Sequence, residues 1–168
     1  MSTIKYISLK KRLIVSRKLS KDSDFEVYED VFEFENTYNT LRLVEILFHG
    51  FDDNTENYEI QNSLLNYIIR ILKNYSINEQ LQVIVTNRIC FYPHAKKWFL
   101  SFLCKYILEK DNLSNVFDIF QKYISIKETI EILNDLKIFT DDLPFEEIKY
   151  NLQYLIEEMN TKISNYNL

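Results

Sequence analysis

The side chains of this sequence that could do chemistry gather in one short run of carboxylates and amides. The run, FHGFDDNTENYEI, covers residues 48–60 and contains Gly50, the only glycine of the chain. Such a cluster could bind calcium or meet a positively charged partner. A single glycine excludes a Walker loop and a GxGxxG fingerprint, so the run is not a phosphate-binding loop.

Calcium binding by this run can be tested against the spacing of an EF-hand loop. Asp52, Asn54 and Glu56 stand at alternate positions, as the first three ligands of such a loop should. The sixth position needs glycine for a sharp turn and is Asn57 here, and the twelfth needs glutamate and is Ser63. Because two required positions differ, the spacing excludes an EF-hand.

Two histidines and two cysteines are the other candidates, and they are His49, His94, Cys90 and Cys104. Their spacing matches no zinc-finger pattern, and a nucleophilic Cys90–His94 pair lacks a third group to orient the histidine. Both cysteines lie in apolar runs, which predicts buried free thiols in a reducing compartment. We therefore expect no metal, no cofactor, no catalytic residue and no enzymatic activity.

The charge of the chain is distributed very unevenly. Residues 1–21 carry seven basic and no acidic side chains, whereas residues 22–59 carry twelve acidic side chains and one basic, Arg42. The acidic segment would repel phosphates within a Debye length of roughly 8 Å, so we do not expect nucleic-acid binding. The basic segment is expected to lie back on the acidic one or to form a solvated tail.

Helix capping accounts for only a few of the twelve acidic side chains in residues 22–59. Asp53, Asn54 or Thr55 could cap the helix that follows, and Glu56 and Glu59 would complement the dipole of its first turn. Twelve acids against one base exceed this need, and like charge destabilises a compact state, so we predict a surface that binds a basic protein. The predicted partner-binding residues are Asp52, Asp53, Glu56, Glu59, Glu26, Glu29, Asp30, Glu33 and Tyr58, with Tyr28 and Tyr38 as further aromatic candidates.

The elements that must position these residues are predicted to be helices. Aromatic residues make up 15% of the chain, which excludes a disordered polyelectrolyte, and one glycine with two prolines leaves too few turns for a β-rich fold. Apolar residues recur at spacings of three and four, as in amphipathic helices. We predict an all-α fold with helices near 24–36, 40–49, 56–74, 77–90, 93–109, 113–124, 126–138 and 144–165, and a helix or short strand over 4–19.

Helix boundaries can be predicted from capping residues. Serine followed by glutamate three positions later forms a capping box, which predicts helix starts at residues 23–26, 76–79 and 125–128. Pro93 and Pro144 suit the first turn of a helix because proline lacks the N–H that is unpaired there. Gly50 is expected to end a helix with a positive φ.

Short links between these helices predict a series of antiparallel helical hairpins. Hairpins of about 33 to 40 residues resemble HEAT-like arrays, and a compact orthogonal bundle is the alternative. The length fits a single domain, residues 1–168, with a basic segment over 1–21 and a helical body over 22–168. Without a signal peptide or a run of about 18 apolar residues, we predict a cytosolic protein that does not enter membranes.

The acidic run and its flanks resemble a known protein family. The segment LVEILFHGFDDNTENYEIQNSLLNYIIRIL, residues 43–72, is similar to the core of bacterial polymorphic-toxin immunity proteins of the thirtieth immunity family. The family pattern is a leucine-rich helix, then Phe-Asp-Asp-x-Thr-Glu-x-x-Glu, then an apolar helix, with a tryptophan about forty residues later and an asparagine-bearing turn. The matching residues are Phe51, Asp52, Asp53, Thr55, Glu56, Glu59, Trp98 and Asn112. The resemblance covers about residues 40–125, and Gln61 and Asn62 depart from it.

The resemblance implies a small cytosolic helical protein, encoded beside a toxin, that binds the C-terminal catalytic domain of the toxin and blocks it. Some members of the family protect against contact-dependent growth inhibition. A basic nuclease is the toxin that an acidic inhibitor would fit best. Two alternatives remain open from the residues themselves: a helical scaffold that holds a partner peptide, and a viral inhibitor of a host pathway.

Overall fold

The computed structural model describes residues 3–33, 40–141 and 146–166, and in these ranges the protein is all helical. About 81% of the chain lies in helices, with nine α-helices and no strand in the described part. The all-α prediction is confirmed, and the first segment is a helix, not a strand. No helix in these ranges is both long enough and apolar enough to cross a membrane.

The chain divides into two compact units, which are described one at a time. The first comprises residues 1–76 and 87–98, and the second residues 77–86 and 99–168. The number of domains, like the HEAT-like or orthogonal arrangement, stays a prediction. The α-helices are α1 (Thr3–Ser16), α2 (Asp22–Glu33), α3 (Leu41–Leu47), α4 (Tyr58–Leu72), α5 (Ile77–Thr86), α6 (Lys96–Ile107), α7 (Leu113–Tyr123), α8 (Ile126–Asp141) and α9 (Glu146–Tyr166).

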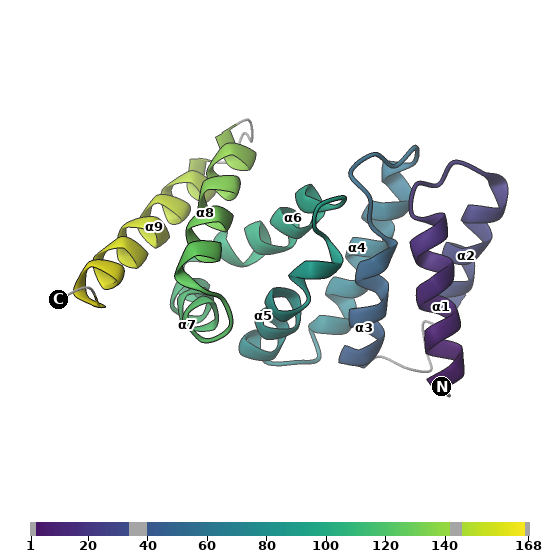
Figure 1. The fold of residues 1–168 in the computed structure, drawn as a ribbon, viewed down its shortest axis with the longest axis horizontal. Coiled ribbons are helices and arrows are strands. Elements are labelled where there is room, and N and C mark those ends of the chain that lie inside the picture. Colours follow the sequence, from purple (N-terminus) through teal and green to yellow (C-terminus); the bar gives the residue numbers. More distant parts are fainter. Residues whose placement is uncertain (1–2, 34–39, 142–145, 167–168) are drawn as a thin grey trace. The chain divides into compact units, whose positions relative to one another are not determined.

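The first unit consists of two helical hairpins, α1 with α2 and α3 with α4 (Figure 1). Helix α1 also packs on α3, and α2 on α4, so the hairpins lie side by side. Short 3₁₀ turns follow α3 at Phe48–Gly50 and α5 at Arg88–Cys90. The core is formed by apolar side chains that repeat at helical spacing, including Leu13, Val44, Leu47, Leu64 and Ile68.

The second unit packs α5 on α7, α7 on α9 and α8 on α9. Two buried polar contacts fix these helices. The hydroxyl of Tyr106 donates to Oε1 of Gln80 at 2.8 Å. The amide of Asn151 donates to the carbonyl oxygens of Ile107 and Leu108, at 2.9 and 3.0 Å, and so satisfies acceptors at the C-terminal end of α6.

One of the predicted capping boxes forms completely. Ser125 Oγ accepts the N–H of Glu128 at 3.3 Å, and the Glu128 carboxylate accepts the Ser125 N–H at 3.2 Å. The box predicted at Ser23 is wrong, because α2 already begins at Asp22 and the Asp24 side chain accepts the N–H groups of Ser20 and Lys21. Asp24 therefore satisfies backbone amides just before the first turn of α2.

The prediction for Gly50 is wrong in its conformation. No described glycine has a positive φ, and Gly50 ends the 3₁₀ turn after α3. Its requirement is space: a Cβ here would lie 2.8 Å from Cδ2 of Leu64 and 3.1 Å from Cδ2 of Leu13. The residue that adopts the left-handed region is Leu19, at φ 54°, between α1 and α2.

Prolines mark the helix starts less closely than predicted. Pro93 follows a cis peptide bond after Tyr92, and α6 begins three residues later, at Lys96. Pro144 lies outside the described residues. The cap of α4 is Asn57, whose side chain accepts the N–H of Ile60 at 3.1 Å, not one of the three candidates before it.

Candidate functional site

The run that carries the family pattern connects the end of α3 to α4 and lies against the start of α6 in the first unit. Phe51 is fully buried, and its ring packs against those of Phe91 and Trp98, with centroids 5.9 and 5.2 Å away. These aromatic contacts hold the run against the segment that precedes α6. The polar residues that follow Phe51 are thereby held in a fixed position.

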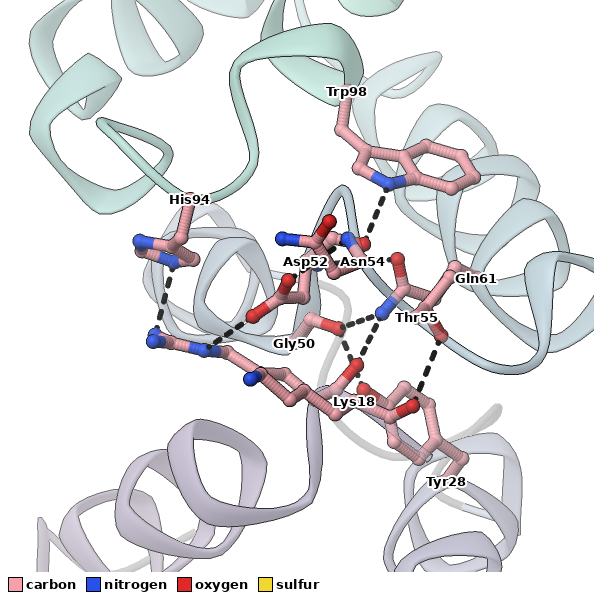
Figure 2. A network of polar contacts seen from close by, with 10 residues as sticks. Lys18, Tyr28, Gly50, Asp52, Asn54, Thr55, Gln61, His94 and Trp98 are labelled. Carbon is pink, nitrogen blue, oxygen red and sulfur yellow. Dashed lines mark hydrogen bonds and ion pairs between the residues drawn. The ribbon is translucent and has the colours of Figure 1, made fainter. Parts of the chain in front are cut away.

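Gln61 lies at the centre of the polar contacts of this run (Figure 2). It is fully buried, and its Oε1 accepts the N–H of Asp52 at 3.2 Å. Its Nε2 donates to the carbonyl oxygens of Arg17 at 2.6 Å and Gly50 at 3.1 Å. The Gly50 carbonyl also accepts the hydroxyl of Tyr28 at 2.6 Å. One amide therefore ties the end of α1, the turn after α3 and α4 together.

Asp52 is buried, with 1% of its surface exposed, and its carboxylate points into the unit. The Nε of Arg17 lies 3.1 Å from Oδ2 of Asp52, and Oδ1 accepts the N–H of Asn54. Nη1 of Arg17 contacts Nε2 of His94 at 2.9 Å. Because a guanidinium can only donate, His94 accepts with Nε2 and is neutral. Burial, then the charge of Arg17, lowers the pKa of His94.

Two further contacts tie the run to the end of α1. The backbone N–H of Glu56 donates to the Lys18 carbonyl at 2.8 Å, and the buried Thr55 hydroxyl lies 3.5 Å from the same oxygen. A separate contact joins the run to α6, where Trp98 Nε1 donates to the Asp52 carbonyl at 3.3 Å. We call the residues Arg17, Asp52, Thr55, Gln61 and His94 the Asp52 network.

Asp53 caps a helix far away in the sequence. Its two carboxylate oxygens lie 3.2 and 3.1 Å from the backbone nitrogen of Lys97 in the first turn of α6. Burial raises the pKa of Asp53, and the hydrogen bond from Lys97 opposes that rise. The carboxylate thus satisfies an unpaired amide at the N-terminus of α6, where the helix dipole favours negative charge.

Tyr58 is the exposed aromatic side chain of this run. Its ring is 53% exposed and stacks on Trp98, with centroids 6.2 Å apart and an interplanar angle of 26°. Its hydroxyl donates to the carbonyl oxygen of Asp53 at 2.8 Å. The ring is therefore held at both ends while one face remains open to solvent. Glu56 and Glu59 next to it have exposed side chains.

The acidic residues of α2 differ in whether they have a partner within the first unit. Asp24 is buried, and Asp30 pairs with Arg12 of α1 at 2.5 Å. Four further acids, three and four positions apart, are exposed on one face of α2, next to Asp30, and we call them the acidic row: Asp22, Glu26, Glu29 and Glu33. None of the four has an ion pair or side-chain hydrogen bond with another part of the described chain.

The predicted partner-binding residues therefore fall into two groups. Glu26, Glu29 and Glu33 are exposed on α2, and Glu56, Glu59 and Tyr58 are exposed at the start of α4. Asp52, Asp53 and Asp30 make contacts within the first unit. Tyr28 is buried and bonded to Gly50, and Tyr38 lies outside the described residues.

Arg17 and Gln61 were not predicted as site residues from the sequence, and the Cys90–His94 pair was considered and rejected. Cys90 Sγ lies 3.4 Å from Nε2 of His49, not beside His94. Burial raises the pKa of the Cys90 thiol and lowers that of His49 to about 4, so the pair is a thiol and a neutral imidazole, without the charge separation that activates a nucleophile. The basic segment beside an acidic one was the only signal for Arg17.

Comparison with known proteins places the chain in a family. The model of a family described as Immunity protein 30 matches residues 15–117, which is more than half of the chain, so the protein belongs to this family. The match covers the Asp52 network and the acidic row, and it ends within α7. No curated protein and no solved structure matches the chain.

Proposed function

We propose that this member of the Immunity protein 30 family binds a cognate toxin domain and neutralises it in the cytoplasm. The toxin would be a basic protein, and a nuclease has the required charge because it must bind phosphates. The contact surface would be the acidic row of α2, with the exposed Glu56, Glu59 and Tyr58 of the α3–α4 connection. No catalytic step and no cofactor is assigned to the inhibitor.

The observation that carries this proposal is the acidic row itself. Four carboxylates repeat on one face of a short helix, while the neighbouring Asp24 and Asp30 are used internally. Carboxylates that repel one another lower the stability of the folded protein unless a partner neutralises them. A basic partner would gain fast, electrostatically steered association from this surface, and a nucleic acid would be repelled by it.

Asp52 and Asp53 have an indirect role in this proposal. Both carboxylates have partners inside the first unit, and Asp52 is buried, so a toxin could not reach Asp52 without displacing them. Their contribution would be to hold the connection between α3 and α4 so that Tyr58 and Glu56 keep fixed positions. A fixed aromatic side chain loses little conformational entropy on binding.

The test is binding to the toxin domain encoded beside this gene, measured by isothermal titration calorimetry at 50 and 300 mM NaCl. We expect nanomolar affinity, slower association at the higher salt concentration, and survival of cells that express both proteins. A toxin domain that releases no heat at either salt concentration, with toxic cells unprotected, would overturn the proposal. Tight binding that does not depend on salt concentration would support toxin binding but would contradict the proposed role of the acidic surface.

A further inference from the structure

The face that α2 and α4 share in the first unit contains a hollow. Its volume is about 470 Å³, and it is lined by Phe32 of α2 and by Ser63, Asn66, Tyr67 and Arg70 of α4. The four α4 residues are spaced at three and four positions, so they form one stripe along the helix. This hollow is not part of the Asp52 network, and the resemblance to immunity proteins assigns no role to it.

Aromatic rings form the apolar part of the hollow. Phe32 and Tyr67 meet edge to face, with centroids 6.1 Å apart and an interplanar angle of 80°. The guanidinium of Arg70 lies 5.3 Å from the centroid of the Tyr67 ring. Because a cation already occupies this ring, a second cationic side chain would be repelled there. The group that fits is uncharged and apolar.

The border of the hollow is acidic on both helices. Glu29 precedes Phe32 by three positions and so lies beside it on α2, and Glu33 lies one turn after Glu29 in the same acidic row. On α4, Glu59 lies one turn before Ser63, whose hydroxyl donates to the Glu59 carbonyl at 2.9 Å. The exposed carboxylates of two helices therefore flank one depression, whose lining combines two aromatic rings with the polar side chains of Ser63, Asn66 and Arg70.

We propose that this hollow receives an apolar anchor side chain of the toxin, and that basic residues around the anchor meet Glu29, Glu33 and Glu59. The inference rests on the proposed function and names the place where the partner docks. Interfaces commonly combine one buried anchor in a pocket with a charged rim. The acidic row steers the toxin toward this face, and the hollow supplies the contact that slows dissociation.

The test fills the hollow without changing charge. Asn66→Trp places a large ring in the depression, and Asn62→Trp puts the same ring at an exposed α4 position that does not line it. We expect Asn66→Trp to weaken the Kd for the purified toxin domain about 30-fold or more, and Asn62→Trp to change it less than about threefold. Ser63→Phe, a second filling variant, is expected to act like Asn66→Trp.

The outcomes separate this inference from the proposed function. Circular dichroism and urea unfolding first establish that the variants fold as the wild type does. Unchanged affinity of Asn66→Trp and Ser63→Phe, beside a wild type that binds and neutralises the toxin, overturns the hollow as the docking site and leaves the proposed function standing. A wild type that does not bind the toxin domain overturns both.

Discussion

The first unit uses carboxylates in two opposite ways within a few turns of chain. In the Asp52 network each carboxylate oxygen has a partner, and Asp52 itself is 1% exposed. In the acidic row of α2 the carboxylates are exposed and have no partner in the described chain. The same residue type therefore contributes to folding in one place and remains available for binding in the other.

This difference changes how the family pattern should be interpreted. A dense acidic run suggests a binding surface, but Asp52 and Asp53 neutralise an arginine and a helix terminus instead. The exposed charge lies on α2, which the pattern does not include, and on Glu56 and Glu59, which it does include. The quoted pattern therefore combines two carboxylates that stabilise the first unit with two that are exposed to solvent.

The largest effect expected from this comparison is on folding. Asp52→Asn removes the negative charge beside Arg17, which is itself only 26% exposed, and should lower the free energy of unfolding by about 2–3 kcal/mol. Glu26→Gln on the acidic row should change it by less than about 0.5 kcal/mol. Urea unfolding followed by circular dichroism measures both values. If Asp52→Asn and Glu26→Gln lower the free energy of unfolding equally, the distinction between structural carboxylates and exposed carboxylates is wrong.

The acidic row should have its largest effect on binding. Replacing Glu26, Glu29 and Glu33 together by lysine should slow association with the toxin domain about 10- to 100-fold at low salt, because the steering field reverses sign. Stopped-flow or biosensor kinetics measure the rate. The matched control makes the same charge change at exposed acids of the second unit, Glu131, Glu147 and Glu158.

If the control slows association as much as the α2 variant does, net charge and not the acidic row governs steering. An unchanged rate in the α2 variant would remove electrostatics from the proposed function. The stability of the α2 variant should remain within about 0.5 kcal/mol of the wild type, since these exposed side chains form no ion pair or hydrogen bond with another part of the described chain.

The sequence predicted the local features of this unit better than its long-range contacts. Periodicity identified the helices, and Ser125 with Glu128 identified a helix start, because both depend on residues within one or two turns. The neighbours of Asp52 are Arg17, 35 positions earlier, and His94, 42 positions later. Nothing in the local pattern reports such separations, so the run was interpreted as a surface.

Gln61 shows the same limit in one residue. It stands at a position where the family resemblance favours a methionine or an aromatic side chain, and it departs from the apolar spacing of α4. The structure places it fully buried, with both ends of its amide bonded. A buried amide is stable only with all its partners present, and those partners come from α1 and from the turn after α3.

A smaller effect is expected from pH, and it should come from the two histidines of the first unit, His94 of the Asp52 network and His49 outside it. The pKa of His94 is lowered in the folded protein, so the unfolded chain binds more protons once the pH falls below about 6.5. Stability should therefore be full above that pH and decrease as the pH falls toward the lower folded pKa. His49, whose pKa is lowered to about 4 by burial and then by the charge of Lys10, contributes in the same direction.

The variant His94→Gln separates the two histidines. Glutamine can still accept from Arg17 through its side-chain oxygen but does not titrate, while the pair between Arg17 and Asp52 is kept. Urea unfolding at pH 7.5 and 5.5 should show a smaller loss of stability in His94→Gln than in the wild type. An identical loss would assign the pH dependence to groups outside the Asp52 network.

The smallest effect concerns an exposed ion pair between α1 and α2. Arg12 of α1 and Asp30 of α2 form a pair whose side chains are 44% and 46% exposed, whereas Arg17 and Asp52 form a pair that is 26% and 2% exposed. Exposed pairs are screened by water and lose side-chain entropy when they form. A double-mutant cycle to alanine should give a coupling of about 0.2–1 kcal/mol for Arg12 and Asp30.

The same cycle on Arg17 and Asp52 provides the comparison. Each single variant there leaves a charge with little access to water, so the coupling should exceed that of the exposed pair. Each cycle needs four urea unfolding curves with equal denaturant dependence, so that only the free energy of unfolding differs among the variants. If the exposed pair couples as strongly as the buried one, burial does not explain why some carboxylates of this unit stabilise the fold and others remain free for a partner.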